Sequence, residues 1–164
     1  ICSANDETDE LEIAFMWTGG TDSSYVFVNG LYVPEGGSPI TGAKTALTNS
    51  MKKLSGKNFD SELIRKGLVY AINCKVTNPS FANQTKTKIN NPNLRTLASQ
   101  AFKKGLEEFS HSQDFKTIVD MLTKIQRAEK AADKAREAIL NQNREIDKET
   151  KKKIKKSVDN IKEI

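Results

Sequence analysis

Residues 67–76 read GLVYAINCKV and predict the most strongly marked strand of the chain. β-branched and aromatic residues favour the pleated conformation, and the glycine at the start of the run separates it from the polar residues before it. Cys74 is expected to be buried in this strand. Because side chains alternate along a strand, one side carries Val69, Ala71, Asn73 and Lys75.

Two strands and a helix are predicted before this run. Residues 11–17, LEIAFMW, alternate as a half-buried strand does, and turn-forming residues follow them. Residues 24–33 are rich in β-branched and aromatic residues and are predicted to form a hairpin with the first strand. Ser38 suits an N-cap and Pro39 the first helical position, so an amphipathic helix should begin there and run to about residue 54. Residues 60–66 are expected to form a short helical turn.

A loop and further helices are predicted after the 67–76 run. The loop covers residues 77–91, and a polar loop of this length in a compact domain is usually functional or disordered. A second helix should cover about 92–108. Apolar residues then keep a helical period from Phe115 to Ile139, large at first and mostly alanine later. We therefore expect a long helix that packs at its start and is exposed further on, followed by a basic helix over about 147–163.

Composition excludes several classes of protein. No apolar run in the 164 residues reaches the roughly 20 that a membrane-spanning helix needs. Cys2 and Cys74 do not make a disulfide framework or a metal set, and the single His111 argues against a histidine-based metal site or hydrolase. The net charge of +5 permits an anionic partner. Ile1 opens an acidic segment without an initiator Met, so we expect a linker or cut edge over residues 1–10 and a longer parent polypeptide.

The candidate chemistry is concentrated in residues 79–88, PSFANQTKTK. A lysine ammonium is a compact charge suited to a phosphate oxygen, and a glutamine amide can donate to the same group or hold a water. Alternate residues of an extended segment point the same way, so Gln84, Lys86 and Lys88 would face one anion together. The alternative interpretation is a solvated surface loop.

The order of several motifs resembles the transducer domain in the ATPase subunit of type IIA DNA topoisomerases, the family of gyrase B. Residues 79–89 match its P-x-F-x-x-QTK-x-K loop, and residues 35–48 resemble its EGGTH segment with the helix that follows. Residues 65–72 resemble its REGL strand entry, and residues 128–137 its alanine- and arginine-rich exit helix. Ser-Pro stands at residues 38–39 where the family has Thr-His, and the lysine-rich C-terminus has no counterpart.

The resemblance implies an α+β fold like domain 2 of ribosomal protein S5, with a left-handed βαβ crossover and a long C-terminal helical extension. This handedness is opposite to the usual rule for parallel strands. The implied domains are a transducer α/β domain over residues 11–110 and a helical extension over residues 111–164, leading toward the DNA-cleavage core.

The resemblance also implies a role for the loop in ATP-driven DNA strand passage. Lys86 would pair with the γ-phosphate of ATP, Gln84 would contact that phosphate or the attacking water, and Thr85 and Lys88 are further candidates. ATP and Mg²⁺ would be bound mainly by an upstream GHKL-type ATPase domain, so we expect no complete catalytic set, no metal site and no activity in this chain alone. The implied partners are that domain, the DNA-cleavage core, duplex DNA and a second copy in a homodimeric enzyme. The implied location is the cytoplasm or nucleus, not a membrane.

Three alternatives stay open. In the first, the basic tail contacts the phosphates of duplex DNA without sequence preference, or it forms a solvated helix face. The acidic residues interspersed in the tail are the reason for the solvated face. Its lysines are Lys151, Lys152, Lys153, Lys155 and Lys156. The same fold would also serve another GHKL ATPase of the mismatch-repair or chaperone type. The last alternative is a helical interaction module without enzymatic activity.

Overall fold

A mixed five-stranded sheet forms the centre of the first of two units in the chain. The computed structural model describes residues 1–162, without the side chains of residue 156 and residues 159–162. The contacts divide the chain into Ile1–Thr123 and a second unit that starts at Lys124. The strand order is β1-β2-β6-β3-β4. These strands are β1 (Cys2–Asn5), β2 (Glu10–Trp17), β3 (Ser23–Val28), β4 (Leu31–Tyr32) and β6 (Leu68–Lys75).

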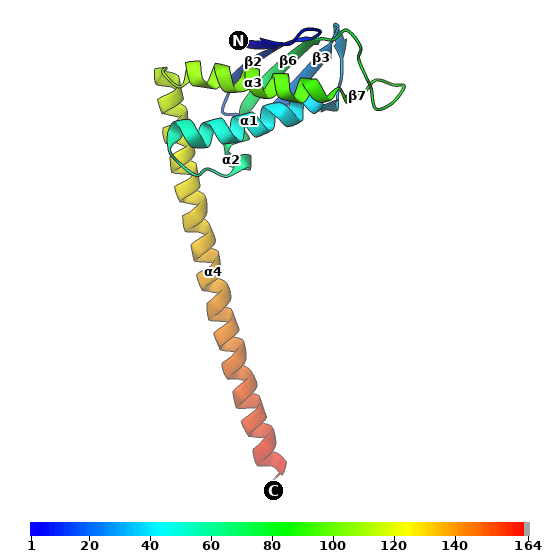
Figure 1. The fold of residues 1–164 in the computed structure, drawn as a ribbon. Coiled ribbons are helices and arrows are strands. Elements are labelled where there is room, and N and C mark those ends of the chain that lie inside the picture. Colours follow the sequence, from blue (N-terminus) through cyan, green and yellow to red (C-terminus); the bar gives the residue numbers. More distant parts are fainter. Residues whose placement is uncertain (163–164) are drawn as a thin grey trace. The chain divides into compact units, whose positions relative to one another are not determined.

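Helices cover one face of this sheet (Figure 1). They are α1 (Ser38–Ser55) and α3 (Pro92–Phe109), and the short α2 (Ser61–Arg65) precedes β6. The core lies between the sheet and these helices, where every second residue of β6 is buried, Cys74 included. The predicted α+β class, the helices predicted near residues 39–54, 60–66 and 92–108, and the alternation along the 67–76 run are therefore confirmed.

The predicted hairpin between the first two strands is wrong, because β6 lies between β2 and β3. It pairs antiparallel with β2 and parallel with β3. The segment after β2 does not turn back on itself but packs against the start of β6. The Thr18 backbone N–H donates to the Gly67 carbonyl over 2.7 Å, and a Cβ on Gly67 would lie 3.0 Å from the Gly19 nitrogen. Gly67, which precedes β6, therefore allows this close backbone approach, whereas a Cβ on Gly19 would meet no atom within 4 Å.

Residues 24–33 form two strands and not one. Asn29 and Gly30 have φ values of 50° and 82°, which matches the tight turn that an Asn-Gly pair favours in hairpins. β3 and β4 pair antiparallel across this turn. The Asn29 side chain also bonds to both backbone groups of Val76, over 2.8 Å each, and so ties the turn to the end of β6.

Residues 2–5, which were expected to be linker, instead form β1, which pairs antiparallel with β2. The acidic residues shape the connection between these strands. The Asp6 carboxylate accepts the backbone N–H groups of Thr8 and Asp9, over 2.9 and 2.8 Å. Asp9 is only 4% exposed, and its carboxylate accepts from the Thr77 backbone N–H and from the Asn93 amide. An acidic composition thus marks a turn here and not disorder.

A single helix, α4 (Gln113–Lys162), replaces the two helices expected in the last third of the chain. The segment between the two expected helices contains neither Gly nor Pro, so nothing local interrupts the backbone hydrogen bonds. Within the first unit, Phe115, Val119 and Leu122 are buried. The described side chains from Arg127 to Lys155 are exposed. The first unit thus includes residues 111–123, which the sequence analysis assigns to the helical extension.

Candidate functional site: the loop between β6 and α3

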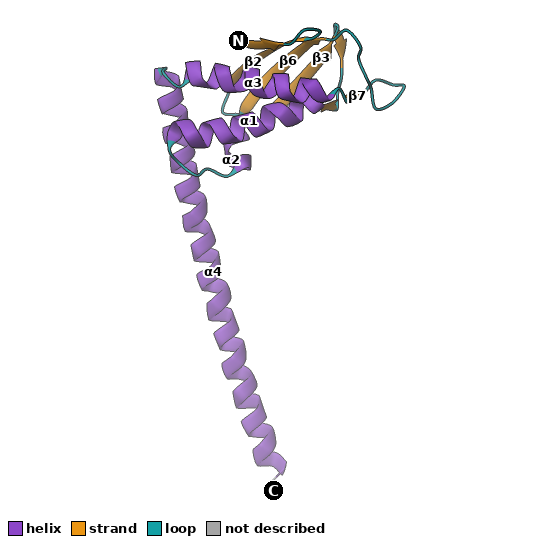
Figure 2. Cartoon of the chain, viewed as in Figure 1, coloured by secondary structure: helices purple, strands orange, loops and turns teal. Residues whose placement is uncertain are grey.

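The predicted anion-binding loop stands out from the edge of the sheet (Figures 1 and 2). Its two arms run antiparallel, with Phe81 opposite Ile89. The Ala82 backbone N–H donates to the Lys88 carbonyl over 2.9 Å. The second arm contains β7 (Lys88–Ile89), a short strand. The loop is therefore an ordered, hairpin-like segment with hydrogen-bonded arms and not a random coil.

The EGG motif, residues 35–37, holds the base of this loop. Its glycines form β5 (Gly36–Gly37), which pairs in parallel with β7. The Glu35 backbone N–H donates to the Thr87 carbonyl over 2.8 Å, and the Thr87 hydroxyl donates to the Glu35 carboxylate over 2.6 Å. Gly37 has φ 111°, and a Cβ there would lie 2.0 Å from the Ile89 carbonyl oxygen. Two motifs that are distant in the sequence are therefore one structural unit.

Asn91 closes the loop at its other end. The Ser80 backbone N–H donates to the Asn91 side-chain oxygen over 2.6 Å, and the Asn91 amide donates to the Asn78 carbonyl over 2.9 Å. The Ser38 hydroxyl donates to the Asn91 carbonyl over 2.7 Å. Ser38 therefore does not cap α1 as predicted. Gly37 occupies the N-cap position, and Ser38 ties the first turn of α1 to the start of α3.

The tip is a turn, which changes how its side chains are displayed. The Lys86 backbone N–H donates to the Asn83 carbonyl over 3.2 Å, and Lys86 has a left-handed φ of 57°. The Asn83 side chain accepts from the Thr87 backbone N–H and donates to its hydroxyl, over 3.1 and 2.8 Å. The expectation that Gln84, Lys86 and Lys88 share one side required an extended backbone. The turn removes this alternation across residues 83–86.

The four predicted contact residues, Gln84, Thr85, Lys86 and Lys88, are exposed. The Lys86 ammonium lies 5.7 Å from the centroid of the Phe81 ring, within the range of a cation–π contact. Among the described residues, no acidic side chain lies within salt-bridge distance of Lys86. The ammonium is thus placed over an aromatic ring and is not fixed in an ion pair.

Four residues that position the loop were not predicted from the sequence, namely Glu35, Asn83, Thr87 and Asn91. Asn and Thr side chains often bond to nearby backbone groups, so Asn83 and Thr87, four residues apart, could have indicated the turn. The link from Glu35 to Thr87 has no local signal, because it joins distant parts of the chain.

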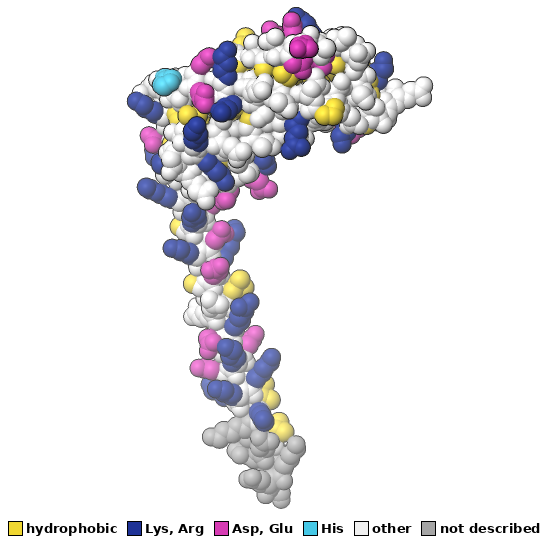
Figure 3. All heavy atoms as spheres, viewed as in Figure 1, with side chains coloured by type: hydrophobic (Ala, Val, Ile, Leu, Met, Phe, Trp, Pro, Cys, Tyr) yellow, Lys and Arg dark blue, Asp and Glu magenta, His cyan; other side chains and the backbone are white. Residues whose placement is uncertain are grey.

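The basic tail lies on α4, with Lys151, Lys152, Lys153 and Lys155 exposed. The side chain of Lys156 lies outside the described residues. Acidic residues share this part of the helix (Figure 3), and Lys148 lies 3.0 Å from Glu145.

Two further features concern the described part of the chain as a whole. It contains no cluster of three or more His, Cys, Asp or Glu side chains suited to a metal ion. None of the helices described is both long enough and apolar enough to cross a membrane.

Comparisons with known proteins give matches over most of the chain. A family profile described as DNA gyrase B matches residues 2–138. The DNA gyrase B protein of Bacillus mycoides is 35% identical over 140 residues, which are 78% of this chain and 35% of that protein. The chain thus spans about a third of the length of this curated relative.

Solved structures show the same arrangement of elements. The 43K ATPase domain of Thermus thermophilus gyrase B, in complex with an aminocoumarin, has a TM-score of 0.73 at 22% identity, over 83% of this chain and 40% of that one. The ATP-binding domain of Francisella tularensis topoisomerase IV has a TM-score of 0.66 at 27% identity, over 79% and 39%. Because its identity is only 22%, the likeness to the Thermus thermophilus structure is evidence for the fold alone.

Proposed function

The chain belongs to the DNA gyrase B family, and we propose that it is the transducer segment of an ATP-dependent type IIA DNA topoisomerase. In this role it couples ATP binding and hydrolysis, in a separate GHKL-type ATPase domain, to DNA strand passage. Family membership favours this role over a mismatch-repair or chaperone ATPase and over a purely helical interaction module. We further propose that β3, α1 and β6 form the left-handed crossover of an S5 domain 2-like fold.

The observation that carries this proposal is the exposed Lys86 ammonium at the tip of the hairpin-like loop. Its contact with the Phe81 ring is worth about 0.5–1 kcal/mol at an exposed site. A hydrogen bond to a charged group is worth about 1.5–3 kcal/mol, which is more than the contact with the ring. A phosphate within hydrogen-bonding distance would therefore displace the Lys86 ammonium from the Phe81 ring. Lys86 would then bind the γ-phosphate of ATP and return to Phe81 after the phosphate leaves.

The other loop residues have assigned roles in this proposal. Gln84 contacts the γ-phosphate or the attacking water, while Thr85 and Lys88 are secondary contacts. The GHKL domain binds most of the nucleotide and the Mg²⁺. The chain alone therefore has no ATPase activity, and the enzymatic activity belongs to the assembled topoisomerase.

The loop connects directly to the helices that would transmit its movement. The Glu35–Thr87 bond and the β5–β7 pairing join it to the N-terminus of α1. The Ser38–Asn91 bond joins α1 to the residue that precedes α3. Since packed helices move as units, a ligand that favours one loop position would shift both helices. The helical extension would carry that shift toward the DNA-cleavage core.

The assembled enzyme would act on duplex DNA inside the cell, as a homodimer. In this setting the lysines Lys151, Lys152, Lys153, Lys155 and Lys156 are candidates for contacts to DNA phosphates. Such contacts would be independent of sequence and would weaken as salt is raised.

A lysine substitution in the full-length protein tests the coupling role. Lys86→Ala should abolish ATP-driven strand passage while DNA binding stays nearly unchanged. Lys53→Ala, which removes an exposed lysine from α1, is the matched control and should behave as the parent protein. Normal ATP-driven relaxation or supercoiling by Lys86→Ala would refute the proposal.

A further inference from the structure

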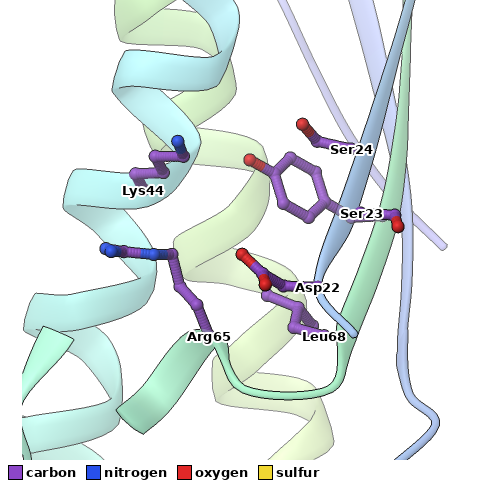
Figure 4. Close-up of a pocket in the computed structure, with 7 residues that line it drawn as sticks. Asp22, Ser23, Ser24, Lys44, Arg65 and Leu68 are labelled. Carbon is purple, nitrogen blue, oxygen red and sulfur yellow. The ribbon is translucent and has the colours of Figure 1, made fainter. Parts of the chain in front are cut away.

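A small pocket lies between α1, α2 and the sheet, apart from the loop. Its volume is about 60 Å³, and Figure 4 shows side chains from several elements turned toward it. α1 contributes Lys44 and α2 contributes Arg65. Ser24 comes from β3 and Tyr70 from β6, while Asp22 precedes β3.

The Tyr70 hydroxyl is the unusual group in this pocket. Tyr70 is 5% exposed, and its hydroxyl is buried without a hydrogen-bond partner. Burial raises the pKa of Tyr70, so the hydroxyl stays protonated and keeps a proton to donate. The Ser24 hydroxyl lies close enough to moderate this pKa shift but not in hydrogen-bonding geometry. Because buried polar groups are nearly always paired, an unpaired phenol facing a pocket indicates a missing polar partner.

The charges around the pocket indicate the sign of that partner. Lys44 and Arg65 supply two cations, and among the described residues neither has an acidic side chain within salt-bridge distance. Asp22 supplies the one carboxylate of the lining, which leaves a net positive charge. Ser23 also lines the pocket, but Figure 4 shows its hydroxyl on the other side of the strand. The remaining hydrogen-bond donors are an ammonium, a guanidinium and the hydroxyls of Ser24 and Tyr70, a set suited to oxygen atoms that carry negative charge.

We propose that this pocket binds a compact free oxyanion of the inorganic phosphate class. The Tyr70 and Ser24 hydroxyls donate to it from the sheet, while Lys44 and Arg65 donate from the helices. The small volume favours a free ion, because a DNA phosphodiester is flanked by two sugars that would keep it from the buried phenol. The site involves none of the loop residues of the proposed function and stands independently of it.

Amide NMR of the intact 164-residue chain tests this proposal. Sodium phosphate is titrated at constant pH and at an ionic strength held constant with sodium chloride. Saturable shifts of the Ser24, Arg65 and Tyr70 amides are expected. Tyr70→Phe should weaken phosphate binding about tenfold, the effect of losing one hydrogen bond to a charged group. The matched control is Tyr25→Phe, which removes an exposed hydroxyl from β3 and should leave the affinity unchanged.

Further variants and probes keep the test decisive. Arg65 is half-buried, and Arg65→Gln should weaken phosphate binding at least as much as Tyr70→Phe does. The test therefore does not depend on Tyr70→Phe remaining folded. A short DNA duplex at the same phosphate concentration should not shift the Tyr70 amide. Shifts that do not saturate would overturn the proposal and indicate a bound water or an adventitious ion only. Equal affinity in parent and Tyr70→Phe, or stronger binding by the duplex, would also overturn it.

Discussion

Gly37→Ala should detach the loop from the body of the protein. Gly37 has φ 111°, a conformation that side chains rarely adopt, and a Cβ there would lie 2.0 Å from the Ile89 carbonyl oxygen. The strained backbone costs about 1–3 kcal/mol. The clash is with backbone, so it is relieved only if β5 and β7 separate. Losing about two hydrogen bonds adds about 1–3 kcal/mol, which gives a total of about 2–6 kcal/mol.

Urea denaturation followed by circular dichroism measures this loss. At a slope of about 2 kcal/mol/M, a loss of about 4 kcal/mol lowers the midpoint by about 2 M. The matched control is Gly56→Ala, because Gly56 also has a positive φ, 66°, but a Cβ there would meet no atom within 4 Å. That change should cost only the left-handed backbone, about 1–2 kcal/mol. The Glu35 amide should exchange faster with solvent in Gly37→Ala, since its partner is the Thr87 carbonyl.

The comparison of the two alanine variants decides the argument. If Gly37→Ala lowers the midpoint no more than Gly56→Ala does, the approach of Gly37 to Ile89 is not an anchor of the loop. An unchanged exchange rate at Glu35 would refute the same reasoning.

Three other expectations follow from the contacts of single residues. The pKa of Asp6 should be about 2, lowered first by the hydrogen bond from the Thr8 backbone N–H and next by the one from the Asn93 amide. The ionised Asp6 carboxylate therefore stabilises the fold above pH 3.8, and this stabilisation is lost as the pH falls through 2. An NMR titration of the Asp6 carboxyl carbon measures this, and a value near 3.8 would contradict it. Burial raises the pKa of Cys74 to about 12. This thiol should therefore react with a disulfide reagent at about pH 8 only when the protein unfolds. Rapid reaction of the folded protein would contradict the burial of Cys74. Asn91→Ala removes two side-chain hydrogen bonds and should lower the free energy of unfolding by about 1–3 kcal/mol in urea titrations, whereas a change below about 0.5 kcal/mol would show that Asn91 does not close the loop.

Local sequence patterns predicted β2, β6, α1 and α3 but not the partners of the strands, and they missed β1 and β7. The 67–76 run and the two sheet-covering helices were predictable because their apolar residues keep one period over a long stretch. The insertion of β6 between β2 and β3 was not, since strand order depends on contacts between distant residues. The Asn29-Gly30 turn did have a local signal, which the run of β-branched and aromatic residues around it obscured.

The candidate site shows the same division. Gln84 and Lys86 were identified from residue type and motif, and the structure places them exposed on the loop. Their geometry was not predictable from an assumed extended chain, because the Asn83 side chain bonds to Thr87 and folds the tip into a turn. The support from Glu35 could not be found locally, because its contact to Thr87 joins residues that are distant in the sequence.

The most direct test of the proposed function is a structure of the protein that contains this segment and its ATPase domain, with a non-hydrolysable ATP analogue bound. We expect the Lys86 ammonium to lie about 2.7–2.9 Å from a γ-phosphate oxygen and no longer over the Phe81 ring. A structure with the analogue in place and Lys86 still over Phe81 would contradict it.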